Sequence, residues 1–479
     1  MALPDFQVPV FDALRLTAVG LDVAAVQRLG AGGIAARQAG RLRALLRVAR
    51  ERSALYRELL PTSAPEAGGQ VELAALAVTH KPALMERFDD WVADPAIRLE
   101  EVRTFLADPD RVGSAFLGRY IVWESSGTSG EPGVFVKDAQ AMAVYDALEA
   151  LRRHTPRPLQ RMVDPLYLSE RLAFVGATGG HFASVVSLER LRRLNPWLGA
   201  AFHTLSIMRP TAELVAELNA FAPTILASYP TAVALLAEQA RLGALAIRPA
   251  EIWTGGETLT AAVREHAEQV FGCSVRNSYG ASEFLAIGGE CAHGRLHANA
   301  DWVILEPVDE RGRPLPPGKA SHSVLLTNLA NHVQPLIRYD LGDSVRFAAE
   351  PCACGSPLPV IEVRGREDDP LVMQDDAGRH VTWLPLALST LLEEDVGVFD
   401  FQLVQRGPRT LALRVGASSE DAALALARCS KALHALARRD GLHGLRCIEE
   451  PGQPLLRGSS GKVQRVVALE SDPRPGRST

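Results

Sequence analysis

Apolar residues recur every three or four positions in the first part of the chain. Between Val23 and Leu60, alanines and leucines occupy these positions, and arginines fill many of the positions between them. The spacing matches the 3.6-residue period of an amphipathic α-helix. We therefore predict a helical N-terminal segment over about residues 1–110.

The pattern changes after Ile121. Short β-rich apolar runs alternate with helical stretches as far as Val345. Such alternation is typical of an α/β domain with a largely parallel sheet, which binds its ligands beyond the carboxyl ends of the strands. Strands are expected at 171–177, 224–229, 250–256, 274–280 and 323–329, and helices at 212–221 and 232–242.

A third pattern begins after Arg366. Strand-like runs at 399–405 and 410–416 precede one long helical stretch at 419–439. About a hundred residues can form an independent domain. We expect an α/β protein in which residues 1–366 form a large N-terminal domain and residues 367–470 form a small α+β domain, which the family resemblance described below implies is mobile. The polar, proline-broken tail 471–479 is expected to be disordered.

The composition is ordinary for a globular protein of two or three domains, with 479 residues, of which 47% are apolar and 22% charged. A formal net charge of −5 gives no general attraction to nucleic acid or anionic lipid. No apolar run reaches the roughly eighteen residues of a membrane helix, and the N-terminus carries acids where a signal peptide carries lysines. We expect a cytoplasmic enzyme or binding protein without a nucleic-acid or membrane partner.

A loop rich in hydroxyls and glycines, SSGTSGEPG at residues 125–133, follows the apolar run Tyr120–Trp123. It offers backbone N–H groups and hydroxyl donors to the oxygens of a phosphate. It lacks the Gly-Lys-Ser or Gly-Lys-Thr ending of a Walker P-loop. From composition alone, a plain surface turn is the alternative, because Gly/Ser-rich segments are often linkers.

Four further motifs follow this loop. They are Tyr-Gly-x-Ser-Glu at 279–283, Arg-Tyr-x-x-Gly-Asp at 338–343, Gly-Arg-x-Asp-Asp at 365–369 and Gly-Lys-x-x-Arg at 461–465. In this order the motifs resemble the adenylate-forming superfamily of acyl-CoA synthetases, peptide-synthetase adenylation domains and luciferases. Within it, the chain is most similar to the phenylacetate-CoA ligase branch, over roughly residues 47–467. The resemblance implies a large domain of the adenylate-forming type with a small C-terminal lid.

The resemblance also implies a nucleotide site built from these motifs. The 125–133 loop would close over the β- and γ-phosphates of ATP, and Tyr279 would stack on the adenine. Asp343 would accept both ribose hydroxyls, and Glu283 would hold Mg²⁺, which takes carboxylate oxygens. The implied ATP- and AMP-binding residues are Ser125, Ser126, Gly127, Thr128, Ser129, Gly130, Gly255, Gly256, Glu257, Asn277, Tyr279, Gly280, Ser282, Asp343 and Arg366.

The catalytic residues that the resemblance implies are Lys462, Glu283 and Thr128. When a carboxylate attacks the α-phosphorus of ATP, negative charge accumulates, and the Lys462 ammonium would stabilise it. Arg465 is expected to support this lysine structurally. Asp368 would be the hinge about which the small domain rotates between the two half-reactions. The alternative for Asp368 is a solvated linker.

One position departs from the family pattern. Many members carry Lys or Thr after the proline of the phosphate loop, whereas this chain carries Gly133. The loop therefore lacks a side chain that could make a direct charged contact with phosphate. Lys137 is the hypothetical substitute for this missing contact.

The segment 172–184 allows two interpretations. Its Gly-Ala-Thr-Gly-Gly is similar to the dinucleotide turn of short-chain dehydrogenases, but such a turn opens its domain and has an acid about twenty residues on, and Glu189 comes too soon. As part of a ligase, the segment would line the acyl pocket. The expected pocket residues are Phe174, His181, Phe182, Tyr229 and Ala281.

Four potential metal ligands lie outside the nucleotide motifs. The chain has six cysteines, too few and too scattered for a disulfide scaffold. Thiolate and imidazole side chains from two chain pieces can hold a structural zinc, although the spacing is not that of a standard finger, and buried reduced cysteines are the alternative. Several proteins similar to phenylacetate-CoA ligase carry such an arrangement with bound zinc. The resemblance thus implies Cys291, His297, Cys352 and Cys354 as ligands, with His293 in reserve.

The function implied is that of an AMP-forming acid–thiol ligase. It would use ATP, Mg²⁺ and coenzyme A, with a structural Zn²⁺, to convert an aromatic (aryl or arylacetic) acid to an acyl-adenylate and then to an acyl-CoA. A close alternative passes the acyl group to a carrier-protein thiol or an amine, or stops at AMP transfer, as in deazaflavin-coenzyme adenylation. A catalytically inactive scaffold is the alternative from another class. The sequence leaves open the acid, the acceptor and whether the chain forms a homodimer.

Overall fold

The computed structural model describes residues 10–61, 73–125, 132–164, 169–195, 199–364, 370–375, 377–398, 401–416, 422–455 and 465–468. Among these residues the predicted α/β fold is confirmed. No helix in these ranges is both long and apolar enough to span a bilayer.

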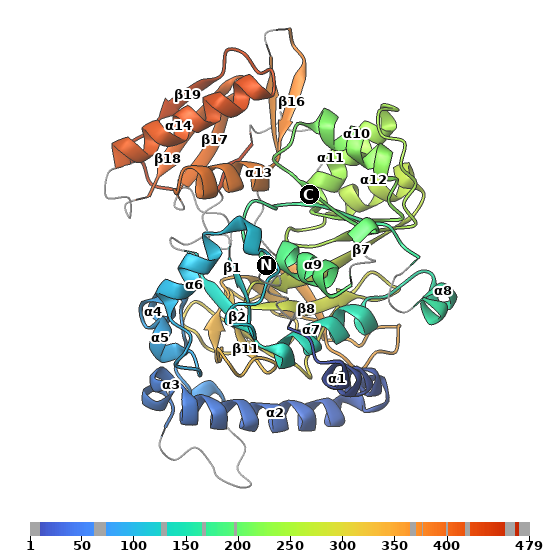
Figure 1. The fold of residues 1–479 in the computed structure, drawn as a ribbon, viewed down its shortest axis with the longest axis vertical. Coiled ribbons are helices and arrows are strands. Elements are labelled where there is room, and N and C mark those ends of the chain that lie inside the picture. The colour runs from blue at the N-terminus through green and yellow to red at the C-terminus, as the bar shows by residue number, and fades with distance from the viewer. Residues whose placement is uncertain are drawn as a thin grey trace, which may run out of the picture.

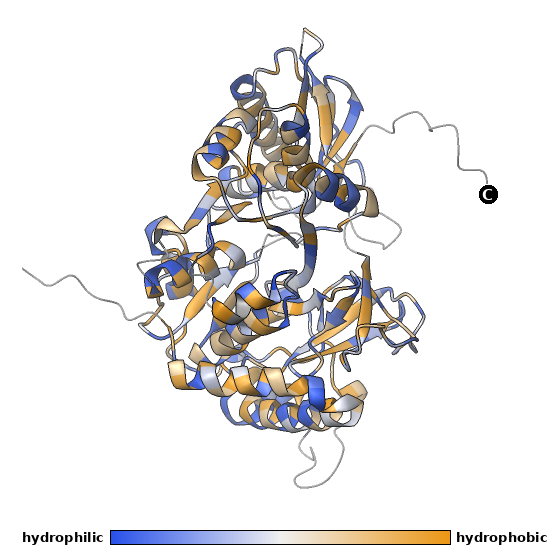
Figure 2. Cartoon of the chain, turned by 90° about the vertical axis from the view of Figure 1, so that its right-hand side faces the viewer, coloured by the Kyte–Doolittle hydropathy of each residue, from blue (hydrophilic) through white to orange (hydrophobic). Residues whose placement is uncertain are grey.

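The N-terminal part is helical, as its apolar spacing predicts (Figure 1). The structure breaks the expected helix at Val26–Leu29 and at Ser53, whose hydroxyl accepts a hydrogen bond from the backbone N of Tyr56 and so caps the next helix. Hydrophobic (orange) and hydrophilic (blue) residues both occur in the helices at the base of the molecule (Figure 2). The helices are α1 (Ala13–Ala25), α2 (Gly30–Arg52), α3 (Ala54–Leu59), α4 (Lys81–Glu86), α5 (Phe88–Trp91) and α6 (Leu99–Leu106).

A nine-stranded sheet forms the centre of the molecule, in the order β13-β14-β9-β8-β7-β6-β5-β3-β4. The five strands from β4 to β7 are parallel, as expected, whereas β7, β8, β9, β14 and β13 pair antiparallel. The sheet is therefore only half parallel, because tight connections replace crossover helices after β7. The strands are β3 (Leu172–Gly176), β4 (Phe202–Ser206), β5 (Ile225–Ser228), β6 (Glu251–Thr254), β7 (Ser274–Ala281), β8 (Phe284–Glu290), β9 (Leu296–Ala298), β13 (Ser344–Phe347) and β14 (Val360–Arg364).

Crossover helices join the parallel strands and cover the sheet. Helices α10 (Thr211–Phe221), α11 (Pro230–Arg241) and α12 (Ala261–Phe271) bury one face of β3, β5, β6 and β7 in a shared apolar core. Helix α12 ends at Gly272, whose positive φ of 67° terminates it in the left-handed conformation that glycine favours. Helix α9 (Ala183–Leu194) packs on the opposite face, against Leu172 and Phe174.

The largest core lies between the helical N-terminal part and two smaller sheets. Helix α7 (Ala139–Arg152) begins where the Asp138 carboxylate accepts the backbone N–H of Ala141, and the short helix α8 (Pro158–Val163) follows it. The strands of the smaller sheets are β1 (Ile121–Glu124), β2 (Val134–Lys137), β10 (Val303–Val308), β11 (Ser323–Asn328) and β12 (Tyr339–Asp340).

The C-terminal part has its own sheet, which Figure 1 shows, and its own apolar core. Strand order in the four-stranded sheet is β19-β18-β17-β20, and α14 packs on it, so both expected strands and the expected helix are confirmed. The proposed boundary at 366/367 and the tail 471–479 lie outside the described residues. The elements are β15 (Leu371–Gln374), β16 (His380–Trp383), α13 (Pro385–Thr390), a π-helical turn (Leu391–Asp395), β17 (Phe401–Gly407), β18 (Thr410–Val415), α14 (Ala422–Arg439), β19 (Arg446–Glu449) and β20 (Val466–Val467).

Candidate active site

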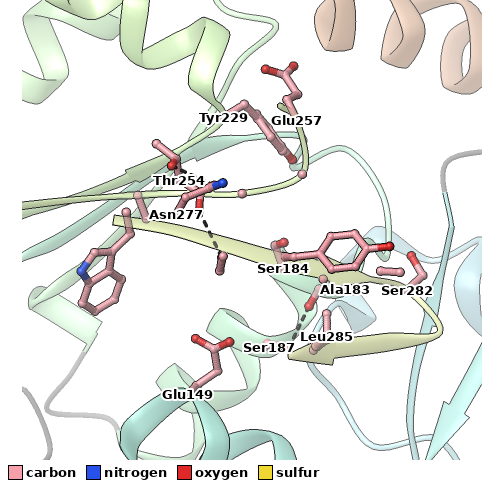
Figure 3. A pocket seen from close by; sticks show the side chains of 18 of the residues that line it. Glu149, Ala183, Ser184, Ser187, Tyr229, Thr254, Glu257, Asn277, Ser282 and Leu285 are labelled. Carbon is pink, nitrogen blue, oxygen red and sulfur yellow. Dashed lines mark hydrogen bonds between the residues drawn. The ribbon is translucent and has the colours of Figure 1, made fainter. Parts of the chain in front are cut away.

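A cavity of about 2350 Å³ opens at the carboxyl ends of the parallel strands, between the central sheet and the C-terminal part (Figure 3). This is the edge at which open α/β sheets bind ligands. Segments far apart in the sequence meet there. The predicted nucleotide and acyl residues that line it are Ser125, Phe174, Phe182, Tyr229, Gly255, Gly256, Glu257, Asn277, Tyr279, Gly280, Ala281, Ser282, Glu283 and Asp343.

The hairpin of β7 and β8 presents the Tyr-Gly-x-Ser-Glu motif to this cavity. The register shifts between Tyr279 and Ala281, so the strand bulges where the motif lies. A side chain at Gly280 would place its Cβ 2.0 Å from the carbonyl oxygen of Leu285, and therefore only glycine fits there. The indole N–H of Trp123, in β1, donates to the carbonyl oxygen of Ser282 over 2.8 Å and holds the turn in place.

Glu283 is a buried carboxyl at the tip of this hairpin, 8% exposed. Burial raises its pKa, while a hydrogen bond from Tyr339 and the nearby Lys81 ammonium lower it in part. Its backbone carbonyl accepts from the Asn328 amide over 2.9 Å, which holds the residue in place. When ionised, this carboxylate offers the oxygen ligands that a hard divalent cation takes.

Tyr279 and Asp343 meet across the cavity wall. The tyrosine hydroxyl donates to Asp343 Oδ2 over 2.9 Å. Burial is the largest cause that raises the pKa of Tyr279 well above its ordinary value, followed by the charge of Asp343, so the phenol stays a donor. The hydrogen bond orients the carboxylate that the sequence predicts for the ribose.

The loop after β6 brings backbone to the cavity. Gly256 has a positive φ of 79°, and a Cβ at Gly255 would lie 2.9 Å from Ser278 Oγ. The Glu257 carboxylate accepts from the backbone N and the hydroxyl of Thr231 over 3.0 and 2.8 Å, at the start of α11. Its side chain thus stabilises a helix N-terminus.

The acyl pocket prediction needs one correction. The rings of Phe174 and Tyr229 meet edge to face at 6.4 Å and line the cavity, but His181 does not line it. His181 is buried, with Nε2 3.0 Å from the carbonyl oxygen of Asp108 and its ring 5.5 Å from that of Phe105. The sequence could not separate His181 from its neighbour Phe182, because their directions depend on the bend of the chain before α9.

Part of the predicted site lies outside the described residues: Ser126, Gly127, Thr128, Ser129, Gly130, Arg366, Asp368 and Lys462. The ends of the phosphate loop are tied together, since Ser125 N donates to the Gly133 carbonyl over 2.8 Å and Gly133 N donates to Ser125 Oγ over 2.9 Å. Arg465 lines the cavity, where it pairs with Glu393 and lies 5.1 Å from the Phe401 ring.

Two lysines differ from expectation. Lys137 does not line the cavity, so its suggested role as a phosphate contact is not supported: it is fully buried, and Nζ has no hydrogen-bond partner among the described residues. Lys81, which the sequence did not single out, does line the cavity beside Gly133 and acts electrostatically on Glu283. Its position at the start of α4, nearly fifty residues before the loop, gave no local signal.

Cys291, His297, Cys352 and Cys354 form a cluster whose ligand atoms all lie within 4.8 Å of one another. Cys291 Sγ lies 3.8 Å from Cys352 Sγ, and Cys354 Sγ lies 3.4 Å from His297 Nε2. His297 Nδ1 lies 2.9 Å from the Leu358 carbonyl oxygen, which directs Nε2 toward the thiols. His293 is not part of the group, so the first choice of histidine agrees with the geometry.

Sequence comparisons match only a small part of the chain. No family model matches the chain. Protein CapK of Staphylococcus aureus is 30% identical over 138 residues, which are 28% of this chain and 29% of that protein, so the match spans less than a third of that relative.

Solved structures match over nearly the whole chain. 2-Hydroxyisobutyryl-CoA ligase in complex with 2-HIB-AMP and CoA in the thioesterification state is 19% identical, with a TM-score of 0.56, covering 98% of this chain and 94% of that one. An open conformation of the same enzyme gives a TM-score of 0.52 at 19% identity and 90% coverage of both chains. The chain therefore has the fold of the adenylate-forming ligases.

Proposed function

We propose that the protein is an ATP-dependent carboxylic acid ligase. In the first half-reaction, a carboxylate oxygen attacks the α-phosphorus of ATP, giving an acyl-adenylate and pyrophosphate. In the second, a thiol attacks the acyl carbon and releases AMP. The observation that carries the proposal is the convergence on one cavity of the residues that the sequence assigns to base, ribose, magnesium and acyl group.

The described side chains suit these roles chemically. The backbone at Gly255 and Gly256 leaves room for a flat base, and Asp343, oriented by Tyr279, can accept from ribose hydroxyls. Glu283 would hold Mg²⁺ bridging phosphate oxygens, which neutralises charge as pyrophosphate leaves. Lys81 would add a cation at the phosphate end of the cavity.

Residues outside the described ranges complete the proposal. Thr128 and its neighbours in the phosphate loop would donate to the β- and γ-phosphates, Arg366 would contact the ribose or phosphate, and Lys462 would stabilise the attacking carboxylate on the α-phosphate. Rotation about Asp368 would then remove Lys462 and admit the thiol.

Coenzyme A is the proposed acceptor of the acyl group. The similar 2-hydroxyisobutyryl-CoA ligase is in complex with an acyl-AMP and CoA, which supports this choice over a carrier-protein thiol or an amine. An aryl or arylacetic acid, the substrate class that the sequence implies, would place its ring beside Phe174 and Tyr229 at the mouth of the acyl pocket. We also propose that the protein belongs to the phenylacetate-CoA ligase branch of these enzymes.

We further propose a structural zinc in the Cys291 cluster. Zinc–sulfur bonds of about 2.3 Å in a tetrahedron place neighbouring ligand atoms about 3.8 Å apart. The Cys291–Cys352 separation of 3.8 Å fits this edge, and the Cys354–His297 separation of 3.4 Å fits a shorter Zn–N bond. The ion would tie the loop after β8, strand β9 and the loop before β14 together, away from the reacting groups.

The test is an acid-dependent adenylation assay. Protein, ATP and Mg²⁺ are incubated with a panel of aryl, arylacetic and aliphatic acids, with and without CoA, and pyrophosphate, AMP and thioester are measured. Pyrophosphate that appears only with an acid, and thioester only with CoA, are the expected results. Thioester formed only with an acyl carrier protein would move the acceptor to that protein. Absence of acid-dependent pyrophosphate from folded protein would leave the inactive scaffold as the better explanation.

A further inference from the structure

The first half of β7 lies at the nucleotide end of the cavity and has a strand partner on one side only. Residues 274–277 pair in parallel with β6, whereas the antiparallel pairing with β8 begins at Ser278. Among the described strands, none continues the ladder on the β8 side of these residues. A buried backbone N–H or C=O without a partner costs free energy, so other groups must supply the hydrogen bonds.

Three side chains supply the missing hydrogen bonds. The Glu268 carboxylate accepts the Val275 N–H over 2.9 Å, and the Arg264 guanidinium donates to the Val275 carbonyl oxygen over 2.7 Å. Glu290, at the end of β8, accepts the Asn277 N–H with Oε2 over 2.9 Å and pairs with Arg264 through Oε1. Glu290 is buried, so loss of its carboxylate would leave the Asn277 N–H without a partner.

Asn277 carries this bond to the nucleotide end of the cavity. Its side-chain oxygen accepts from the Thr254 hydroxyl over 3.1 Å, and both residues line the cavity (Figure 3). Thr254 immediately precedes the two glycines that the sequence assigns to the base, and Tyr279 lies two residues after Asn277. The Glu290 carboxylate therefore positions a strand whose next residues would contact the nucleotide.

Glu290 also begins the hairpin that carries half of the metal cluster. We call residues 290–297 the metal hairpin, because Cys291 and His297 lie near its two ends. Strands β8 and β9 pair across it, and part of its turn lines the cavity. Glu290 and Cys291 are joined by one peptide bond, so a ligand of the cluster and the partner of the Asn277 N–H share one short piece of backbone.

Metal binding would fix the metal hairpin to the loop of Cys352 and Cys354. Without a metal, the cluster is joined only by sulfur contacts, 3.8 Å from Cys291 to Cys352 and 3.4 Å from His297 to Cys354, and sulfur is a weak hydrogen-bonding group. Four bonds to one ion hold the same groups rigidly. Ordering a hairpin costs conformational entropy, and a bound metal would meet this cost before a nucleotide binds.

We infer that Glu290 is a positioning residue that couples the metal cluster to the nucleotide end of the cavity. The inference rests on the proposed ligase function and on the proposed metal site, whose occupancy would regulate nucleotide affinity. A loaded cluster holds the Glu290 carboxylate against the Asn277 N–H and so preserves the strand that receives the nucleotide. Because coupling between two sites is reciprocal, a bound nucleotide also tightens the binding of the metal.

Calorimetric titration of ATP with Mg²⁺, without an acid substrate, measures the coupling in the full chain. Zinc-loaded protein should bind ATP at least tenfold more tightly than protein from which a chelator has removed the zinc, since coupled sites typically differ about 5- to 150-fold. Saturating ATP should lower the Kd for zinc by the same factor, measured by competition with a chromophoric chelator. Equal ATP affinities of the two folded forms would overturn the inference.

Glu290→Ala separates the coupling from metal binding. It should keep one equivalent of zinc, because none of the four ligands is changed, yet bind ATP at least tenfold more weakly and equally with and without zinc. Glu290→Gln keeps an acceptor for the Asn277 N–H and should give an intermediate ATP affinity. Glu238→Ala removes a carboxylate that also pairs with an arginine, Arg241, but lies outside the cavity, and it should leave the coupling unchanged. A zinc-loaded Glu290→Ala protein with the ATP affinity of the parent would contradict the inference.

Two further measurements cover a parent that unfolds without zinc and a parent that binds no ATP. In the first case the larger Cd²⁺, which thiolates also bind, replaces zinc as the comparison: it should weaken ATP binding at least threefold in the parent and not in Glu290→Ala, and equal affinities of the zinc and cadmium forms overturn the coupling. In the second case the ligase is rejected, and hydrogen exchange tests the link alone. Zinc should slow exchange of the amides of residues 275–278 at least tenfold in the parent but not in Glu290→Ala, and equal exchange overturns the link. A parent that binds no zinc overturns the inference and leaves the proposed ligase intact.

Discussion

Lys137 should destabilise the folded protein, and its replacement by methionine should stabilise it. The side chain ends β2 in the interior, with Nζ 5.3 and 5.4 Å from the ring centres of Trp123 and Phe135 and no hydrogen-bond partner among the described residues. Burial lowers the pKa of Lys137 to about 7, against which the charges of Glu283 and Asp138 act weakly. Methionine keeps the length of the stem and removes the ammonium.

The pKa fixes both the size and the sign of the effect. A fall from 10.5 to about 7 corresponds to a cost of about 4 kcal/mol at pH 7, at 1.36 kcal/mol per unit. Because the folded pKa is lowered, the unfolded chain binds more protons between pH 7 and 10.5, and stability rises with pH in this window. The slope should be about 1.4 kcal/mol per pH unit, and the full cost applies below pH 7. Loss of the contacts with the two rings offsets about 1 kcal/mol of the gain.

Urea unfolding followed by tryptophan fluorescence at pH 7, 8 and 9 measures this contribution. Lys137→Met should raise the midpoint at pH 7 by an amount equivalent to about 3 kcal/mol, with a smaller gain at pH 9. Lys319→Met makes the same change at an exposed lysine and should leave the midpoint unchanged. A Lys137→Met protein that is less stable than the parent at pH 7, with the same pH dependence, would refute the reasoning.

Three other substitutions test the site. Asp343→Asn removes the charge that Tyr279 orients and should raise the KM for ATP at least tenfold with a smaller effect on the KM for the acid, measured by pyrophosphate release. Cys354→Ser removes one of the four clustered ligands and should reduce bound zinc from one equivalent to less than 0.2, with a lower Tm. The control Cys447→Ser should retain the metal. A parent protein that contains no zinc on metal analysis would contradict the site. Lys462→Ala should slow adenylation at least a hundredfold but slow thioester formation from supplied acyl-adenylate less than fivefold, and equal losses in both half-reactions would remove its assigned role.

Periodicity predicted most of the local structure and little of the long-range packing. The strands at β3, β5, β6, β7 and β11 and the helices α10, α11 and α14 lie where the apolar pattern places them, because burial of one face is a local property. The antiparallel half of the sheet was not predicted. The pairing of β7 with β8 depends on a turn at Ser282 and Glu283, and sequence analysis interpreted these two residues as part of a binding motif instead of a turn. Gly280 shows the limit: the sequence marks the glycine, and only the structure reveals the Leu285 carbonyl that requires it.

The same distinction separates the site residues that sequence reasoning found from those that it missed. Tyr279, Glu283 and Asp343 belong to short sequence motifs. The family resemblance could predict them because each motif is associated with one role in the site. Lys81 lines the cavity but belongs to no motif, because its electrostatic effect on Glu283 depends on long-range packing. Glu257 carries a motif, yet its carboxylate stabilises the start of α11.

The two halves of the cavity are therefore constrained differently. At the nucleotide end, steric limits at Gly255 and Gly280 and hydrogen bonds to Asp343 and Glu257 fix the backbone, so a substitution there displaces groups that must contact the same ligand. At the acyl end, the rings of Phe174 and Tyr229 contact each other edge to face, so a substitution there changes the shape of the pocket without a direct contact to the hairpin that carries Glu283. Substrate range should accordingly follow the aromatic residues that line the acyl end, while adenylation follows the motifs. If Phe174→Ala alters the KM for ATP as strongly as the KM for the acid, this separation of the two ends fails.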